Sequence, residues 1–416
     1  MNKTATTMAI SHLKRPAKAI TLLAISSLAI SLYCYPARGD EQPTVAAIQS
    51  IARDAMKQYH LKALIVRVTS DEKNVYTAAL GESMSGVPAT PDMHFRAGSM
   101  GFTYMATMLL EFVDQKKVKL DDNLAKFFPD LPHSDQITLK NLANMTSGYA
   151  DYVYQPEVIR GYISDPFRQW RPEELIQIGT SKPLMFEPGS NFGYSHTNYV
   201  ILGRVLEKIA GMPLAEAMQK YIYGPMNLPQ TRSFSTPQVP EPVLHSFTSE
   251  RRGDLHIPSS TPFYEESTFW NPSWTTGEGA IQTTDITDMA TTMEAVGTGK
   301  VLSKASFAAQ VGPNLVGRTH IDPNCLANAC LLPNTLKANY GLGVINLGPW
   351  ITQLKGFSGN NAAVGYLPAK KLAIAVTTTY EPAAYDDVGI CQDASKEIFT
   401  SLANVLAPGT LPKPKL

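Results

Sequence analysis

This sequence of 416 residues has no net charge, few cysteines and few long apolar runs. Lys and Arg total 36, as do Asp and Glu, so the formal net charge is zero. A nucleic-acid-binding protein needs a basic surface to neutralise phosphates, and this balance therefore argues against nucleic acid as a partner. With 44% hydrophobic and only 17% charged residues, the chain is not of the disordered class. The composition therefore predicts a large globular protein that is big enough to form a cleft.

Metal-binding and phosphate-binding motifs are missing as well. The eight histidines form no HExxH pair and the four cysteines form no CxxC motif, so the sequence gives no support for a metal site. The glycine-rich loops GxGxxG and GxxxxGK[ST], which bind nucleotide phosphates, are also absent. We therefore expect a function that uses neither a metal nor a cofactor.

The N-terminal segment 1–39 contains basic residues and no acidic ones. Its apolar run, AITLLAISSLAISLY at 19–33, is about 15 residues long and so falls short of the roughly 20 that span a bilayer. Ala37 and Gly39 place small residues at −3 and −1 of a cleavage site before Asp40. These features predict a secretory signal peptide over 1–39 and a periplasmic or secreted protein. The alternative is an N-terminal anchor that is not cleaved.

Three cysteines follow the predicted cleavage site. Cys325 and Cys330 flank a short loop that an exported protein would close as a small disulfide, which would leave Cys391 as a free thiol. A Cys330–Cys391 pairing is the alternative.

Strand patterns gather at both ends of the remaining chain, and helical patterns lie in its middle. The β-rich runs are at 61–69, 74–81, 340–347, 350–356 and 372–380, the first two joined as a hairpin. Apolar residues at helical spacing predict helices over 103–114, 197–210 and 286–296, and a further helix is expected over 387–406.

Four ordered segments carry a family resemblance. They are HFRAGSMGFTYM from residue 94, ITLKNLANMTSGYADY from 137, FEPGSNFGYSHTNYVILG from 186, and GEGAIQTTDITDM from 277 with LKGFSGNNAAVGYLP from 354. Together they resemble the serine β-lactamase-like proteins, which include class C β-lactamases, DD-carboxypeptidases and related esterases. The resemblance implies an α+β, β-lactamase/transpeptidase-like fold, an antiparallel sheet flanked by helices with an inserted helical lobe. It places a sheet domain at 40–98 and 336–416, and a helical domain at 99–335.

The resemblance also implies an acyl-enzyme mechanism and the residues that perform it. In this family a serine at the start of a helix attacks a carbonyl, aided by a lysine one helical turn on and by a tyrosine. Ser99 matches the nucleophile and Tyr194 the tyrosine. In the third motif, Ser358 and Gly359 lie in the substrate-binding position, and Asn360 would supply the second oxyanion N–H beside that of Ser99.

Three positions depart from the family pattern. Phe102 stands where the family has its lysine, Phe357 replaces the basic residue of the third motif, and His196 replaces the asparagine that follows the tyrosine. Two basic groups are thus lost, and one imidazole is gained. A neutral imidazole can accept the serine proton, so His196 is a candidate general base.

Two functions follow from these residues. The first is an exported serine hydrolase that acts on esters, amides or peptides through Ser99, with a small molecule, peptide or cell-wall fragment as substrate. The second is a catalytically inactive relative that binds a cell-envelope ligand or partner, in which Ser99 is only a helix N-cap. The sequence does not indicate an oligomeric state.

Overall fold

An eight-stranded antiparallel sheet lies at the centre of the computed structural model, which describes residues 41–277, 281–321 and 334–412. Its strand order is β3-β2-β1-β13-β12-β11-β10-β9. The strands are β1 (Leu61–Ser70), β2 (Lys73–Met84), β3 (Val87–Pro88), β9 (Ala338–Tyr340), β10 (Ile345–Leu347), β11 (Trp350–Phe357), β12 (Asn360–Leu367) and β13 (Leu372–Tyr380). The pairing of β1 with β13 joins the two ends of the chain, so the expected single sheet from both ends is confirmed.

Both faces of the central strands are covered, which explains their sequences. Every residue of β13 is buried, and β1 reads LKALIVRVTS instead of alternating between apolar and polar residues. A strand with one face in water would alternate, whereas a strand covered on both sides is apolar throughout. Along β1, Leu64 and Val66 enter one apolar cluster, while Ala63 and Ile65 enter the other.

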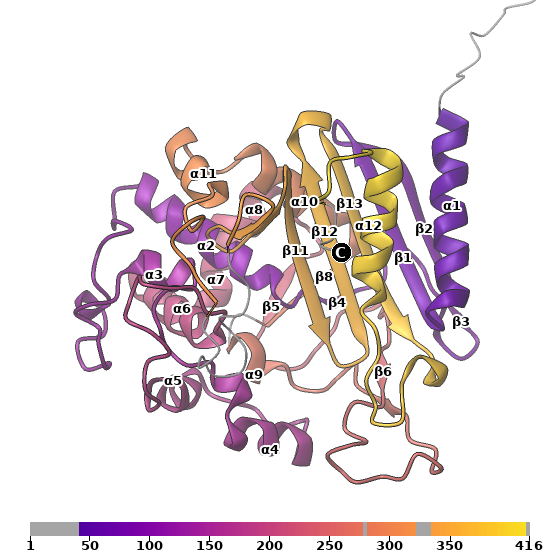
Figure 1. Ribbon diagram of the computed structural model, residues 1–416, viewed down its shortest axis with the longest axis horizontal. Coiled ribbons are helices and arrows are strands. Elements are labelled where there is room, and N and C mark those ends of the chain that lie inside the picture. Colours follow the sequence, from indigo (N-terminus) through magenta and orange to yellow (C-terminus); the bar gives the residue numbers. More distant parts are fainter. Residues whose placement is uncertain (1–40, 278–280, 322–333, 413–416) are drawn as a thin grey trace, which may run out of the picture. The chain divides into compact units, whose positions relative to one another are not determined.

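Helices from distant parts of the sequence cover the two faces. The helices α1 (Glu41–Gln58) and α12 (Ala394–Leu406) pack together on one face (Figure 1). The helix α10 (Ile286–Thr298) packs against β1, β12 and β13, and α2 (Met100–Asp114) contacts β11. The larger apolar cluster lies on this second side and continues into the helical lobe.

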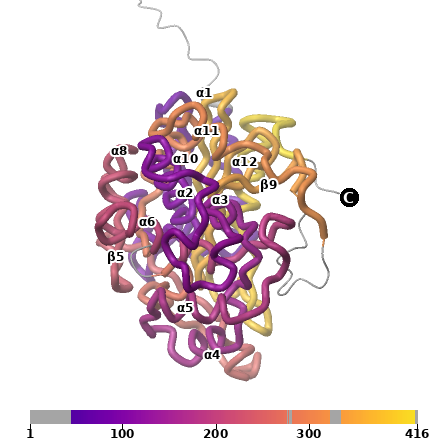
Figure 2. Tube along the Cα trace, turned by 90° about the vertical axis from the view of Figure 1, so that its left-hand side faces the viewer, coloured from indigo at the N-terminus to yellow at the C-terminus, as the bar shows by residue number. Residues whose placement is uncertain are grey.

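The helical lobe surrounds α2 (Figure 2). Its other helices are α3 (Leu139–Ala143), α4 (Pro156–Ser164), α5 (Pro172–Thr180), α6 (His196–Ala210), α7 (Leu214–Met218), α8 (Gly224–Met226), α9 (Ser273–Thr276) and α11 (Lys304–Val311). Two small sheets accompany it, one of β4 (Phe95–Arg96), β8 (Ile281–Thr284) and β5 (Arg232–Phe234), and one of β6 (Phe247–Thr248) and β7 (Glu265–Glu266). The expected helices over 103–114, 197–210 and 286–296 are present with starts within three residues of those expected.

Two expected elements were wrong in extent. The C-terminal helix begins at Ala394 and not near residue 387, because Asp386 accepts hydrogen bonds from the N–H groups of Val388 and Ile390 and holds a turn there. Asp393 then caps α12 through the N–H groups of the following residues. The run 340–347 is two strands, since the chain turns back between β9 and β10.

Residues from Glu41 onward pack as one unit, and the division into 40–98 with 336–416 and 99–335 stays a prediction. The signal peptide at 1–39 and the pair Cys325 and Cys330 lie outside the described residues. Cys391 is a free, partly buried thiol. None of the helices in the described ranges is long and apolar enough to cross a bilayer.

Ile374 provides a test of the packing between the sheet and α12. It is fully buried in the cluster on that face. Ile374→Ala should lower the free energy of unfolding by about 2–5 kcal/mol, because it removes buried methyl groups and leaves a cavity. Urea unfolding measures this change. Val405→Ala is the control, since Val405 on α12 is 47% exposed and its truncation should change stability by less than about 0.5 kcal/mol. Equal effects from both variants would contradict the packing described.

Candidate active site

Ser99 lies at the N-terminal end of α2, where the chain passes close to β11. A Cβ atom on Gly98 would lie 2.3 Å from Cγ of Lys355, and Gly98 has a φ of +57°, so glycine is required there. Ser99 is the N-cap residue, but its hydroxyl makes no capping hydrogen bond. The side chain is partly exposed. Its hydroxyl is therefore available for chemistry. A serine that served only as a helix N-cap would use this hydroxyl to accept a backbone N–H, and Ser99 does not.

Ser99 and His196 line the same pocket, which has a volume of about 170 Å³. Most of its wall is apolar. The other lining residues are Arg96, Gly98, Val153, Pro272, Trp274, Thr275, Ile281, Gln282, Gly356 and Phe357. A larger cavity of about 770 Å³ lies beside α5 and α6, but it is lined by no serine, cysteine or histidine. In the described ranges, no group of three or more His, Cys, Asp or Glu side chains could hold a metal ion.

Tyr194 donates a hydrogen bond to the Ser99 Oγ at 3.4 Å. Burial raises the pKa of the Tyr194 phenol, and the charge of Asp151 raises this pKa further, against the opposing effect of the hydrogen bond to Ser99. The phenol therefore stays protonated at neutral pH. A protonated phenol can donate to the serine oxygen but cannot accept its proton.

His196 is the first residue of α6, and an aspartate holds its ring. The Nδ1 atom of His196 lies 2.9 Å from Oδ2 of Asp151. The Asp151 side chain is only 2% exposed, and that of His196 is 17% exposed. The other oxygen of Asp151, Oδ1, accepts the N–H of Val153 at 3.1 Å, which caps the short helix η2 (Tyr152–Tyr154). Asp151 was not among the site residues predicted from the sequence.

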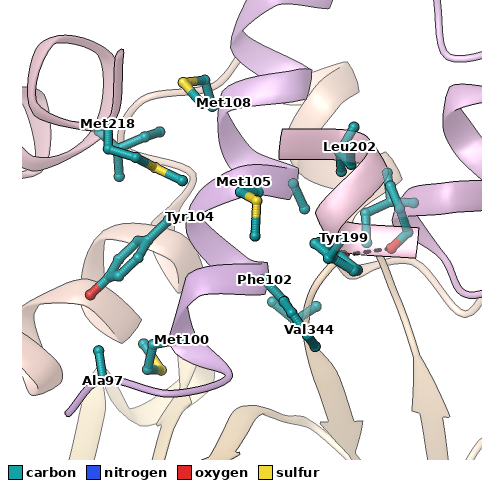
Figure 3. Packing of buried hydrophobic residues seen from close by; sticks show 14 of the residues in the cluster. Ala97, Met100, Phe102, Tyr104, Met105, Met108, Tyr199, Leu202, Met218 and Val344 are labelled. Atoms are coloured by element: carbon teal, nitrogen blue, oxygen red, sulfur yellow. Dashed lines mark hydrogen bonds between the residues drawn. The ribbon is translucent and has the colours of Figure 1, made fainter. Parts of the chain in front are cut away.

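Phe102 forms an apolar wall behind these side chains. It is fully buried, and its ring stacks on that of Tyr199 with the centroids 4.2 Å apart (Figure 3). The Phe102 centroid is 5.5 Å from that of His196 and 5.8 Å from that of Tyr194. The position that carries a lysine in the resembled proteins therefore contributes no charge here.

The third motif forms the turn between β11 and β12, and only part of it reaches the pocket. Phe357 and Gly356 line the pocket. Ser358 shares a hydrogen bond with the Tyr162 hydroxyl, and the N–H of Gly359 donates to Glu250 at 3.3 Å.

The Asn360 side chain is buried and donates to Thr377 Oγ1 and to the Thr378 carbonyl, at 2.9 and 3.0 Å. The roles of Ser358, Gly359 and Asn360 in binding an oxyanion or substrate stay predictions.

Lys355 lies on the same face of β11, two residues before Phe357. Its Nζ donates to Oδ1 of Asn360. Burial lowers the pKa of Lys355 well below its usual range, and the positive charge of Arg96 lowers it further. Lys355 is therefore a poor replacement for the permanent positive charge of the third motif.

Comparisons with known proteins show which family the chain belongs to. The model of the Beta-lactamase family matches residues 48–390. The chain belongs to this family. Two curated relatives, each named "Putative D-alanyl-D-alanine carboxypeptidase", come from Salmonella agona and Salmonella paratyphi B and are 29% and 30% identical over 166 residues. The matched region covers 36% of this chain and only 37% of each relative.

Solved structures confirm the β-lactamase/transpeptidase-like fold of this family member. A D-stereospecific amidohydrolase from Streptomyces sp. superposes with a TM-score of 0.70 at 22% identity and covers 87% of this chain and 98% of its own. A D-amino acid amidase from Ochrobactrum anthropi SV3 gives 0.71 at 19%, with the same coverage. An octameric penicillin-binding protein homologue from Pyrococcus abyssi gives 0.68 at 20%, covering 88% of this chain and 79% of its own. At these identities the likeness concerns the fold.

Tyr194→Phe tests whether the phenol is a base or a donor. Since the raised pKa keeps the phenol protonated, its removal should lower kcat for ester hydrolysis by no more than about 10-fold, the value of one neutral hydrogen bond. For the same reason the activity of the unchanged protein should show no second rise between pH 8 and 10. Steady-state kinetics across pH measures both. A loss of 100-fold or more, or a second rise at alkaline pH, would identify Tyr194 as the base.

Proposed function

We propose that this protein is a serine hydrolase that forms an acyl-enzyme on Ser99 and uses His196 as its general base. The observation that carries the proposal is that Ser99 and an imidazole line one pocket, and that Asp151 holds this imidazole through its Nδ1. His196 carries an imidazole, the type of side chain that exchanges protons near neutral pH, as a general base requires. The proposal includes export, supported by the signal-like segment 1–39.

In the acylation step, Nε2 of His196 takes the proton of Ser99 while Oγ attacks the substrate carbonyl carbon. The imidazolium then protonates the leaving group as the tetrahedral intermediate collapses. The negative charge that develops on the carbonyl oxygen needs N–H donors. The Ser99 N–H can provide one, because no acceptor for it is found in the described part of the chain. A water molecule activated by the same imidazole releases the acyl group.

Tyr194 supports the step as a donor. Its hydrogen bond to Oγ fixes the rotamer of Ser99 and keeps the oxygen within the pocket. Phe102 and Tyr199 close the site from behind and exclude water from that side. A dry wall strengthens the interactions of the reacting charges, because the local dielectric constant is low.

The pocket favours a small, uncharged acyl group. Its walls include Phe357, Val153 and Ile281, and Phe357 occupies the position of the family's third-motif cation. Arg96 also lines the pocket, but its guanidinium is buried and donates to the backbone carbonyls of Pro237 and Gln238. The indole N–H of Trp274, another residue of the pocket wall, is buried and has no acceptor among the described residues, so it can donate to a polar atom of the substrate. Esters and amides whose acyl group carries no charge are therefore the proposed substrates.

Ser99→Ala and His196→Asn test this function together. On a panel of short-chain p-nitrophenyl esters, each should lower kcat/KM by about 10²-fold or more, the usual size of a general-base effect. A fluorophosphonate probe should label Ser99, and labelling should be lost in Ser99→Ala. Activity of the unchanged protein should rise with pH through one group near or below neutrality, because the base must be deprotonated.

Two control variants match these changes. Ser303→Ala removes another N-cap serine, and His245→Asn removes another histidine whose Nδ1 lies beside a carboxylate, that of Glu266, at 2.5 Å. Both should keep full activity. If His196→Asn keeps full activity while Ser99→Ala loses it, His196 is not the base. If the unchanged protein neither hydrolyses an ester nor reacts with the probe, the protein is the catalytically inactive binding protein. The replacement of the family's lysine by Phe102 would then explain the lack of activity.

Carboxylate-bearing β-lactams test the loss of the third-motif cation. Hydrolysis of a cephalosporin should be weak or undetectable, because Phe357 offers no charge to the substrate carboxylate and burial lowers the pKa of Lys355. Absorbance at 260 nm follows the opening of the ring. A neutral ester of the same cephalosporin is the control, and its turnover should be at least equal. Efficient hydrolysis of the free acid would show that another cation serves this site.

A further inference from the structure

We infer that Asp151 is a positioning residue for His196, so that Ser99, His196 and Asp151 act as a Ser–His–Asp triad in place of the serine–lysine pair. This inference rests on the proposed function of Ser99 and His196. The family resemblance assigned no role to Asp151, which lies 45 residues before His196 in the sequence.

The two carboxylate oxygens of Asp151 have separate partners. Oδ1 accepts the N–H of Val153, which fixes the carboxylate plane, and Oδ2 lies 2.9 Å from Nδ1 of His196. An ionised carboxylate can only accept hydrogen bonds, so Nδ1 must carry the proton. The Nε2 atom then keeps its lone pair, which is the state a general base requires.

Three aromatic rings restrict the imidazole further. The centroids of Phe102, Tyr194 and Tyr152 lie 5.5, 5.5 and 6.2 Å from that of His196. With Nδ1 held by Asp151 and these rings packed around it, the imidazole has little freedom to rotate. Since Ser99 and His196 line one pocket, the accessible part of the ring faces the same space as the nucleophile.

The charges change in a consistent way during the reaction. The O–H bond of Ser99 breaks, its proton moves to Nε2, and Oγ forms the new bond to carbon. The resulting imidazolium lies beside the buried carboxylate of Asp151, which stabilises it and stays ionised. Burial raises the pKa of the Tyr152 and Tyr194 phenols beside the ring, so they add no charge near neutral pH. Arg96, on β4, is the other charged side chain among the described residues that line this pocket.

Asp151→Asn in the full-length chain tests the inference, with Asp393→Asn as the matched control. Asn keeps the cap on η2 but can donate to Nδ1, which would move the imidazole proton to Nε2. Asp393 also accepts an N–H two residues on, again at 3.1 Å, but holds no histidine. Asp151→Asn should lower kcat by on the order of 10²–10⁴-fold with little change in KM. The midpoint of the pH profile should fall by about one unit, because the imidazolium loses its anionic neighbour.

A second measurement does not depend on activity. In ¹⁵N-histidine NMR spectra recorded above the midpoint, the His196 signals, assigned by their loss in His196→Asn, should show the Nδ1–H tautomer in the unchanged protein. They should show the Nε2–H tautomer in Asp151→Asn. Asp151→Glu should recover part of the lost kcat, and Asp393→Asn should change none of these properties.

The outcomes separate this inference from the proposed function. If Ser99→Ala and His196→Asn lose activity while Asp151→Asn keeps its kcat and pH midpoint, Asp151 only caps η2 and the inference is wrong. An Nε2–H tautomer in the unchanged protein also overturns it, even if Asp151→Asn fails to fold. If His196→Asn keeps full activity, the proposed base is wrong instead, whatever the tautomer.

Discussion

The site depends on the fixed position of α2 between the sheet and the lobe. Twelve of its fifteen residues are buried. Thr103 donates to the carbonyl of Gly343 and accepts from Gln353 of β11, which ties the helix to the sheet. On the lobe side, Phe102 stacks on Tyr199 of α6. Because α2 contacts both the sheet and the lobe, it fixes the start of α2, the start of α6 and the end of β11 relative to one another. Ser99, His196 and Phe357 lie at those three ends.

The apolar residue at 102 determines what the tyrosine can do. A lysine beside Tyr194 would stabilise a phenolate and lower the pKa of the phenol, because an opposite charge favours the ionised form. With a phenyl ring there, burial and, after it, the charge of Asp151 raise the pKa of the phenol. The tyrosine thus changes from a possible base to a donor, although its position next to Ser99 is kept. In the proposed mechanism the proton acceptor is therefore a different group, His196, which lines the same pocket as Ser99.

Most of the fold was predictable because strand and helix patterns are local. The run 61–69 is apolar and β-branched, and it forms a strand covered on both faces. Ser99, Tyr194 and His196 could be named as candidates because each lies in a recognisable motif, and their catalytic roles stay predictions. Asp151 could not, since a single aspartate after Ser-Gly-Tyr-Ala has the local pattern of an N-cap and its histidine partner is distant in the sequence. The start of α12 was misplaced because turn residues before Asp393 fit the helical period.

The departures from the family pattern are physically coupled. A lysine in place of Phe102 would have to enter a fully buried position packed against Tyr199, where burial would lower its pKa. In the proposed mechanism it would also lie beside an imidazole that becomes positive, and the two like charges would oppose each other. A neutral ring at 102 avoids this repulsion and packs against the imidazole. In the proposed mechanism, phenylalanine can therefore replace the lysine because His196 takes over as the base and the negative charge of Asp151 stabilises its imidazolium.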